Sequence, residues 1–374
     1  MSKRGITRVK SIMLLLCVSF LIAQAIPQQA KASDTPVIES ETAVLLDGAT
    51  GETLWEKDST KRMYPASVTK IITAIVAIEE GNLEEKVAVS ENVMDVIGTR
   101  VYLLPGEEVS LLKLVQGLMI NSGNDAGLAI AEHMDGSEEA FAQRMNRFVE
   151  EEIGVKDSHF TNPHGLFDEN HYTTAKDLAM ITKYAMENEV FKEIAQTKEM
   201  EWMGEGWETT IYNHHRMLWD YEGVTGVKNG FVQRSGFTLS TAVERDDMEL
   251  IAVTLNAPAA KVSYQDTAAL FDYGFTRYEP HVIKSDRLFS DESGRKYELE
   301  NDIYYVMEKG KESTVDVTNE GMLQIENTEG KVLKEVPLKE QKDKEDLIDN
   351  PNVNETAEQG FIQWFLRFIP FTNP

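Results

Sequence analysis

The sequence predicts an α/β domain in which a helical block is inserted into an antiparallel sheet, followed by a small all-β domain and a C-terminal amphipathic helix. Three observations predict it. Strand-like segments flank a long helical region, short alternating runs follow residue 280, and an apolar stretch of about ten residues lies close to the end of the chain. With 374 residues, 42% of them hydrophobic, the chain can form two domains and a substantial core.

The first 32 residues predict a secretory signal peptide. Four basic residues within the first ten precede an apolar run at 12–23, and alanines at 30 and 32 suit cleavage before Ser33. An uncleaved anchor is the alternative, although the run is short for a membrane span. We therefore expect a mature protein outside the cytoplasm. The only cysteine, Cys17, lies in this segment, so neither a disulfide nor a cysteine nucleophile is expected.

The charge of the mature chain excludes one class of partner. Residues 1–32 carry five basic and no acidic side chains, which leaves 32 basic and 63 acidic residues and a formal charge of −31. Binding to a phosphate backbone requires clustered cations. We therefore expect no nucleic-acid partner, and interpret the acidic surface as one that keeps the protein soluble.

The predicted elements of the first domain follow in order. Residues 43–55 form two strand-like segments around a glycine-containing turn and predict a strand hairpin. Ser67 opens an almost wholly apolar helical stretch that ends near Ile78, which predicts a buried helix. Because the strands flank the helices, the first and last strands are expected to share one sheet in a domain that spans 33–278. The remaining helical patterns lie at 110–120, 124–134, 137–153, 174–188 and 264–274, and further strands at 236–244 and 248–256.

The C-terminal part predicts three further segments. Residues 279–338 show short alternating runs typical of a β-rich domain, and 339–358 are rich in charge, which predicts a solvated linker. In the last segment, 359–374, apolar residues leave only Gln363 and Arg367 for a narrow polar face. This helix is too short to span a bilayer, so we expect it to lie on a membrane surface. Docking on the protein's own core is the alternative.

Three short motifs carry the functional prediction. They are Ser67-Val68-Thr69-Lys70, Ser122-Gly123-Asn124 and Lys228-Asn229-Gly230. Each is weak alone, because Ser-x-x-Lys also occurs at Ser110 and Ser293, and a helix cap or a solvated lysine would explain any single match. Their ordered combination predicts an acyl-transfer site with a serine nucleophile.

The first motif pairs a nucleophile with a base. Ser67 is a weak nucleophile at neutral pH, and Lys70 lies one helical turn later on the same face. Lys70 can accept the proton only if burial and a neighbouring cation such as Lys228 lower its pKa. The backbone N–H of Ser67 and one from the strand after Lys228 are the expected oxyanion donors.

The other motifs complete the predicted site. Ser122 would relay a proton between Lys70 and the leaving amine, and Asn124 would bind the peptide carbonyl of the substrate. Lys228 would place positive charge near the substrate's terminal carboxylate. Ser122 and Asn124 could instead cap the helix that begins near Asp125.

The residues around the motifs resemble the low-molecular-mass penicillin-binding proteins that act as serine D-alanyl-D-alanine carboxypeptidases. The resemblance covers about 38–278, and the β-rich domain and tail extend it. It rests on Pro65 to Lys70, Asn121 to Ala126, Phe-Thr-Asn-Pro-His-Gly-Leu at 160–166, and 171–179. Within the family, the chain is similar to the spore-cortex enzymes of endospore formers.

This resemblance implies a penicillin-recognising, transpeptidase-like domain followed by a β-sandwich-like domain. It implies removal of the terminal D-alanine from peptidoglycan stem peptides through an acyl-enzyme on Ser67. β-Lactams would act as covalent inhibitors, and no cofactor would be needed. With the tail, it implies a protein held on the outer face of the cytoplasmic membrane.

The third motif departs from the family pattern. The family usually has Lys-Thr-Gly-x-Thr, whereas this chain has Asn229 and Val232 at the two hydroxyl positions that would bind the terminal carboxylate. Where some relatives carry a supporting arginine, His214 is in register and Arg216 follows two residues later. A lost charged hydrogen bond costs about 1–3 kcal/mol. We expect a slow or pH-sensitive enzyme, in which Asn229 and a His214 charged below about pH 6.5 compensate in part. Gly230 is expected to line the substrate-binding strand beside Asn229.

Four alternatives stay open at this point. A wall-binding protein could keep the penicillin site without turnover, and a DD-endopeptidase could cut cross-links with the same residues. A β-lactamase is disfavoured by the missing Glu-x-x-Leu-Asn segment and by the second domain. A zinc peptidase is disfavoured because the seven histidines include no His-Glu-x-x-His, so we expect no metal. His164 and His171 are expected to order loops near the site.

Overall fold

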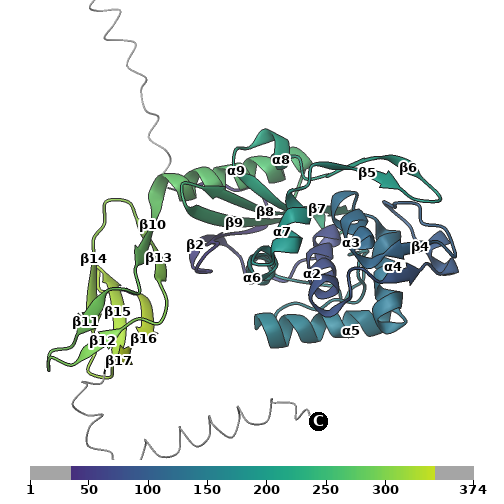
Figure 1. Cartoon of the computed structure of the whole chain (residues 1–374). Helices are drawn as coiled ribbons and strands as arrows, with labels where there is room; N and C mark the ends of the chain where they lie inside the picture. The colour runs from purple at the N-terminus through teal and green to yellow at the C-terminus, as the bar shows by residue number, and fades with distance from the viewer. Residues whose placement is uncertain (1–34, 342–374) are drawn as a thin grey trace, which may run out of the picture. The chain divides into compact units, whose positions relative to one another are not determined.

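The computed structural model describes residues 35–341 (Figure 1). The expected signal peptide with Cys17, nearly all of the expected linker and the amphipathic tail lie outside the described residues. All helices and strands below belong to the unit that begins at Glu39. Within 35–341, no helix is both long and apolar enough to cross a membrane.

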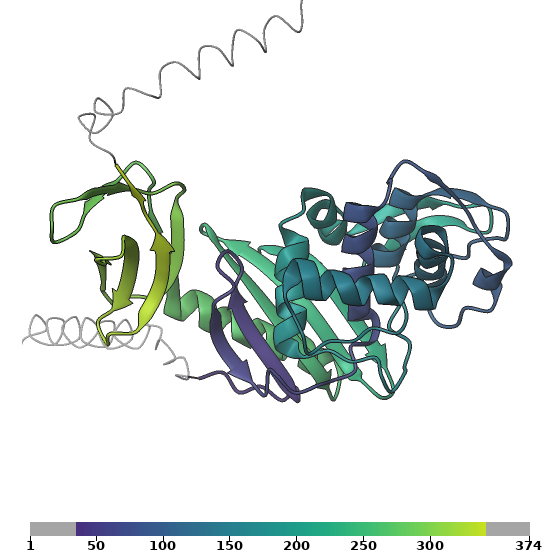
Figure 2. The same ribbon diagram turned by 90° about the horizontal axis from the view of Figure 1, so that it is seen from below.

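A five-stranded antiparallel sheet with the order β2-β1-β9-β8-β7 forms the frame of the first part. Its first strand pairs with its last, Thr42 opposite Leu255, as expected for a sheet interrupted by a helical block. Figure 2 shows the purple strands β1 and β2 beside the green strands from the other end of the domain. The strands are β1 (Thr42–Asp47), β2 (Thr53–Lys57), β7 (Val224–Val232), β8 (Gly236–Arg245) and β9 (Met248–Ala257).

Helices cover both faces of this sheet. Figure 1 shows α9 (Ala260–Arg277) on one face, and α6 (Ala175–Met186), α7 (Glu189–Gln196) and α2 (Lys70–Glu80) on the other. The strand β1 is consequently buried at every position. Two-sided burial explains why its sequence is a continuous apolar run rather than an alternating one.

The helical block supplies the positions from which the functional residues project. In α2 every residue from Lys70 to Ile78 is buried, so this apolar helix is the centre of the core, as the sequence predicts. The Ser110 hydroxyl accepts a hydrogen bond from the Lys113 N–H, so this second Ser-x-x-Lys match is a helix cap. The other elements are η1 (Ala66–Thr69), β3 (Lys86–Ala88), η2 (Glu91–Met94), β4 (Glu108–Ser110), α3 (Leu111–Ile120), α4 (Asn124–Asp135), α5 (Glu138–Phe148), η3 (Val149–Ile153), β5 (Glu199–Met203), β6 (Glu208–Tyr212) and α8 (Met217–Asp220).

The described chain after α9 is entirely β-structure and turns, in agreement with the predicted all-β region. It has its own hydrophobic core, to which Phe289, Tyr297, Leu323 and Ile325 contribute. The strand β10 begins directly after α9 and pairs with β13. The strands are β10 (Tyr278–Ile283), β11 (Leu288–Ser290), β12 (Lys296–Glu298), β13 (Ile303–Glu308), β14 (Ser313–Val317), β15 (Met322–Asn327), β16 (Val332–Pro337) and β17 (Lys339–Glu340).

Candidate active site

Ser67 lies in a tight turn immediately before the buried helix α2. The turn is the 3-10 segment η1, and Ala66 within it adopts a left-handed conformation with φ of 53°. A loop packs directly against it, because a Cβ atom at Gly165 would lie 1.8 Å from the Ala66 carbonyl oxygen. From β8, the Thr238 hydroxyl donates a hydrogen bond to the Pro65 carbonyl oxygen at 2.8 Å. Loop and sheet together therefore hold the turn that presents Ser67.

Lys70 is fully buried at the start of α2, and its Nζ atom lies 3.1 Å from Ser67 Oγ. The same amine contacts Asn124 Oδ1 at 2.7 Å and the His164 carbonyl oxygen at 2.8 Å. Burial, and then the positive charge of Lys228, lower the pKa of Lys70 well below its ordinary value. Both causes agree with the expectation from the sequence.

This geometry suits a neutral amine. The Asn124 amide oxygen and the His164 carbonyl oxygen can only accept hydrogen bonds, so they take the two N–H groups of an uncharged Lys70. The remaining lone pair is then available to accept the Ser67 hydroxyl proton. Lys70 is thus arranged as a general base.

Asn124 connects Lys70 to the loop that precedes α3. Its Nδ2 atom donates to the Ile97 carbonyl oxygen at 2.7 Å, while its Oδ1 atom accepts from Lys70. The second N–H of the amide is available to a substrate carbonyl. The sequence had indicated the substrate contact, but not that the same side chain orients the base.

Ser122 lies in the turn between α3 and α4 and is buried, with φ of 61°. The alternative capping role of this motif is wrong, because the N-cap of α4 is Gly123 and no side chain caps the helix there. Asp125 anchors the neighbouring loop instead. Its carboxylate accepts hydrogen bonds from the N–H groups of Val101 at 2.9 Å and Leu103 at 3.1 Å.

The strand β7 runs against the nucleophile turn. A Cβ atom at Gly230 would lie 2.7 Å from the Ser67 nitrogen and 3.1 Å from the Val68 nitrogen, so only glycine fits. The strand is also at the edge of the sheet, with its second side unpaired by any described strand. This close approach is what an oxyanion hole built from the Ser67 N–H and a β7 N–H requires.

Lys228 is buried on β7, and burial lowers its pKa to about 7. Its Nζ atom donates to the Asn229 carbonyl oxygen at 3.1 Å. No carboxylate among the described residues pairs with it. Lys228 therefore supplies a cation that depresses the pKa of Lys70 and is titratable near neutral pH.

The alternation of β7 separates the two positions at which the family hydroxyls are missing. Lys228, Gly230 and Val232 point to one face of the strand, whereas Asn229 and Phe231 point to the other. Asn229 and Val232 therefore project from opposite faces of β7.

His214 and Arg216 both reach the protein surface. Desolvation of the ring, and then the charges of Lys228 and Lys70, lower the pKa of His214 to about 4. The expectation that it becomes charged below about pH 6.5 is wrong, because desolvation of the ring, and then the neighbouring cations, oppose its protonation. Arg216 forms an exposed ion pair with Asp220, with 3.8 Å between Nε and Oδ2.

Two buried histidines order the loops, as expected. His171 accepts a hydrogen bond from the Thr161 N–H at Nδ1, at 3.1 Å, so its Nε2–H donates to the Thr69 hydroxyl at 2.8 Å. Burial lowers its pKa to about 3, which keeps this bridge neutral. His164 contributes its carbonyl oxygen to Lys70, and its ring contacts Glu138 at 2.8 Å. In the sequence, the segment at 160–166 that contains His164 and Gly165 had indicated this loop.

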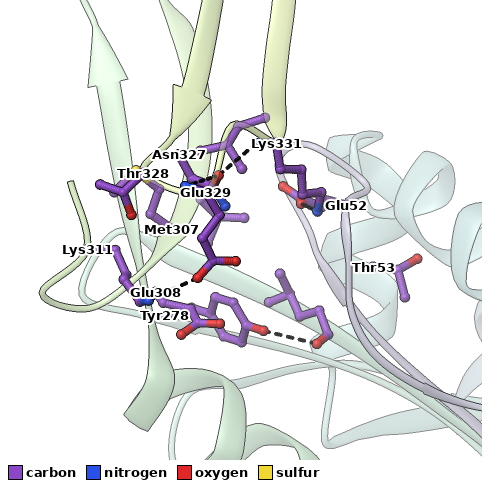
Figure 3. Close-up of a pocket in the computed structure, with 13 residues that line it drawn as sticks. Glu52, Thr53, Tyr278, Met307, Glu308, Lys311, Asn327, Thr328, Glu329 and Lys331 are labelled. Carbon is purple, nitrogen blue, oxygen red and sulfur yellow. Dashed lines mark hydrogen bonds and ion pairs between the residues drawn. The ribbon is translucent and has the colours of Figure 1, made fainter. Parts of the chain in front are cut away.

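A separate pocket lies between β2 and the β-rich region, with a volume of about 210 Å³ (Figure 3). Its lining contains no residue of the three motifs, and opposite charges within it pair with one another. Within the described chain, no cluster of three or more His, Cys, Asp or Glu residues could hold a metal ion. The pairs in the pocket are Lys331 with Glu52 at 3.4 Å and Lys311 with Glu329 at 3.3 Å.

Comparison with known proteins identifies the family of this chain. Residues 29–259 match the family model of peptidase S11, described as D-alanyl-D-alanine carboxypeptidase. The D-alanyl-D-alanine carboxypeptidase DacF of Bacillus subtilis is 31% identical over 338 residues, covering 87% of this chain and 83% of the relative. DacC of Escherichia coli is 30% identical, covering 72% and 70%.

Solved structures show the same fold. Penicillin binding protein 5 from Haemophilus influenzae superposes with a TM-score of 0.73 at 26% identity, covering 83% of this chain and 98% of that one. The Streptomyces K15 DD-transpeptidase gives 0.61 at 27% identity, covering 64% and 98%. The chain therefore belongs to the peptidase S11 family of serine D-alanyl-D-alanine carboxypeptidases.

Proposed function

We propose that the protein removes the terminal D-alanine from peptidoglycan stem peptides through an acyl-enzyme on Ser67. The observation that carries this proposal is the environment of Lys70. Its buried amine lies 3.1 Å from Ser67 Oγ, and two oxygen acceptors orient its lone pair toward that hydroxyl. Family membership supplies the substrate class.

The reaction begins when Lys70 takes the Ser67 proton and Ser67 Oγ attacks the carbonyl carbon between the two D-alanines. The N–H of Ser67 and an N–H of β7 stabilise the negative oxygen of the tetrahedral intermediate. The intermediate collapses as the bond to nitrogen breaks, and the proton passes from Lys70 through Ser122 to the leaving amine. Water, deprotonated by Lys70, then attacks the ester and releases Ser67. A β-lactam would follow the first step and remain attached.

The substrate would lie along the free edge of β7 as an added strand. We infer that Asn124 donates to a peptide carbonyl and that Lys228 and Asn229 face the terminal carboxylate, because the Lys228 Nζ atom lies 3.5 Å from Asn229 Oδ1 although the two residues alternate along the strand. His214 is neutral at pH 7, because its pKa is about 4. Lys228, itself half-charged near pH 7, would then be the principal cation for that carboxylate. Slow carboxypeptidase turnover follows from this weak recognition.

A second candidate is an endopeptidase that cuts cross-links, because weak recognition of a terminal carboxylate costs less where the residue after the scissile bond lacks a free carboxylate. A penicillin-binding protein with little turnover is the limiting case of slow deacylation. Release of D-alanine from a cross-linked dimer and from a free pentapeptide, compared under one set of conditions, separates these activities.

The primary test is D-alanine release from diacetyl-L-Lys-D-Ala-D-Ala, with Ser67→Ala as the control. Release that requires Ser67 supports the proposed function. Covalent labelling by a fluorescent penicillin without any release would mean that Ser67 acylates but that stem peptides are not hydrolysed. Absence of both would refute the proposal.

We further propose that residues 33–278 form the catalytic domain, that 279–338 form a second domain, and that 359–374 hold the mature protein on the outer face of the membrane. The apolar residues of the last segment leave only Gln363 and Arg367 for its polar face. Truncation after residue 358 should release the protein from membrane fractions with penicillin labelling intact. Retention of the truncated protein would contradict the anchor.

A further inference from the structure

An arginine without an ionic partner lies in the turn that joins β7 to β8. Arg234 is exposed, and no described residue forms an ion pair or hydrogen bond with its guanidinium. Several other arginines of the described chain form ion pairs, for example Arg62 with Asp157 and Arg144 with Asp135. A free guanidinium on a protein of formal charge −26 is available to an anion from outside.

Two aromatic rings accompany this cation. The Arg234 guanidinium carbon lies 5.8 Å from the centroid of the Phe167 ring, and that ring meets Tyr64 edge to face at 5.0 Å. Phe167 is 43% exposed, so the rings are accessible. We call Arg234, Phe167 and Tyr64 the Arg234 cluster.

The cluster is tied to the catalytic centre by three chain segments. Tyr64 precedes the nucleophile by three residues, and Phe167 follows His164, whose carbonyl oxygen binds Lys70. Arg234 follows Gly230, the residue of β7 that touches the Ser67 nitrogen, by four residues. The cluster therefore borders the end of β7 that lies beyond the nucleophile.

The direction of the substrate places the acyl donor at this end, an argument that rests on the proposed function. Lys228 and Asn229 receive the carboxylate of the leaving D-alanine, so the rest of the stem peptide extends past Phe231 toward Arg234. In an extended chain, the Cα atom of the residue before the D-alanine pair lies about 5 Å from the scissile carbonyl. A side chain of four methylenes reaches roughly another 6 Å, toward the turn after the end of β7 at Val232 in which Arg234 lies.

We propose that the Arg234 cluster is a specificity subsite for a carboxylate on the side chain of the residue that precedes the two D-alanines. The guanidinium would bind the carboxylate, and the rings of Phe167 and Tyr64 would pack against the methylenes. An ammonium at the same place would meet the positive charge of Arg234. The subsite thus favours stem peptides with an acidic side chain over those with a lysine.

Three isosteric peptides test this specificity. They share acetyl and D-Ala-D-Ala ends and carry L-2-aminopimelate, its side-chain amide, or L-lysine at the preceding position. We expect kcat/KM to be roughly five- to tenfold higher for the carboxylate than for the amide, and lowest for lysine. Arg234→Gln should remove the advantage of the carboxylate over the amide, mainly through KM, and leave kcat/KM for the amide unchanged.

A matched control comes from the β-rich region. Arg287 is likewise stacked on an aromatic ring, 5.2 Å from the Phe289 centroid, and Arg287→Gln should preserve the substrate order. An equal loss of kcat/KM for all three peptides in Arg234→Gln, or an unchanged order of kcat/KM among them, would overturn the proposal.

A second readout does not need turnover. The rate of Ser67 acylation is compared for a penicillin with an adipoyl side chain and for its terminal amide. If no peptide is hydrolysed, the proposed function fails. The proposal of an anion-binding subsite is then tested by the acylation rates alone, and it stands if Arg234→Gln abolishes a preference for the adipoyl compound. Equal acylation rates in the original protein, or no acylation at all, would overturn the inference.

Discussion

Replacing Gly230 by alanine tests the arrangement on which the proposed mechanism depends. The added Cβ would lie 2.7 Å from the Ser67 nitrogen and 2.6 Å from Thr238 Oγ1. An ordinary contact is about 3.4 Å or more, so strand and turn must separate by roughly 0.7 Å. Oxyanion donors act at about 2.7–3.1 Å, and such a shift takes at least one of them out of range.

The expected loss follows from the value of one donor. Removal of a single oxyanion donor lowers kcat by about 10²- to 10³-fold, or about 2.7–4 kcal/mol. We therefore expect Gly230→Ala to slow acylation by a labelled penicillin, measured as a second-order rate constant, by about two orders of magnitude or more. The melting temperature should change little, because the edge strand can move outward.

Gly127→Ala is the control. Gly127 lies inside α4, where an added methyl would meet mainly the tip of the Leu118 side chain at 3.2 Å, and alanine favours a helix. This variant should fold and acylate like the original protein. Undiminished acylation in a folded Gly230→Ala protein would refute the close approach of β7 to the nucleophile, and with it the proposed oxyanion hole.

Three further predictions concern charge and carboxylate binding. Because the pKa of Lys70 is lowered, acylation should be lost only as the pH falls far enough to protonate the amine, and Lys70→Arg, which stays charged, should reduce it by about 10²- to 10⁴-fold at every pH. The pKa of Lys228 is about 7 in the folded state and about 10.4 in the unfolded chain. Between these pH values the unfolded chain binds more protons, so the free energy of unfolding should rise with pH. Lys228→Met should remove this part of the pH dependence in urea titrations, and an unchanged pH dependence would contradict the burial of the lysine charge. Asn229→Thr combined with His214→Arg should raise kcat/KM for a D-Ala-D-Ala peptide about tenfold or more. Val232→Thr, on the opposite face of β7, should leave kcat/KM unchanged. A gain from Val232→Thr without a gain from the double variant would contradict the assignment of faces.

The order of the elements could be predicted from local patterns. The apolar stretch after Ser67 predicts a buried helix because nearly every position is apolar, and α2 is buried from Lys70 to Ile78. The pairing of the first strand with the last could also be inferred, since strands flank the helices. The 3-10 turn in which Ala66 has a positive φ could not be predicted from the sequence. Contacts with the loop at Gly165 and with Thr238 hold this turn, and both are distant from it in sequence.

The sequence by itself determined the chemical groups of the site, because a serine, a lysine one turn later, a second serine with an amide and a cationic strand define one kind of chemistry. Only the tertiary structure decided the state of those groups. The pKa of Lys70 depends on burial and on the charge of Lys228, and that of His214 on the same cations, so both are set by distances through space. The need for glycine at 230 and the meeting of Arg234 with Phe167 likewise arise only when segments far apart in the chain come into contact.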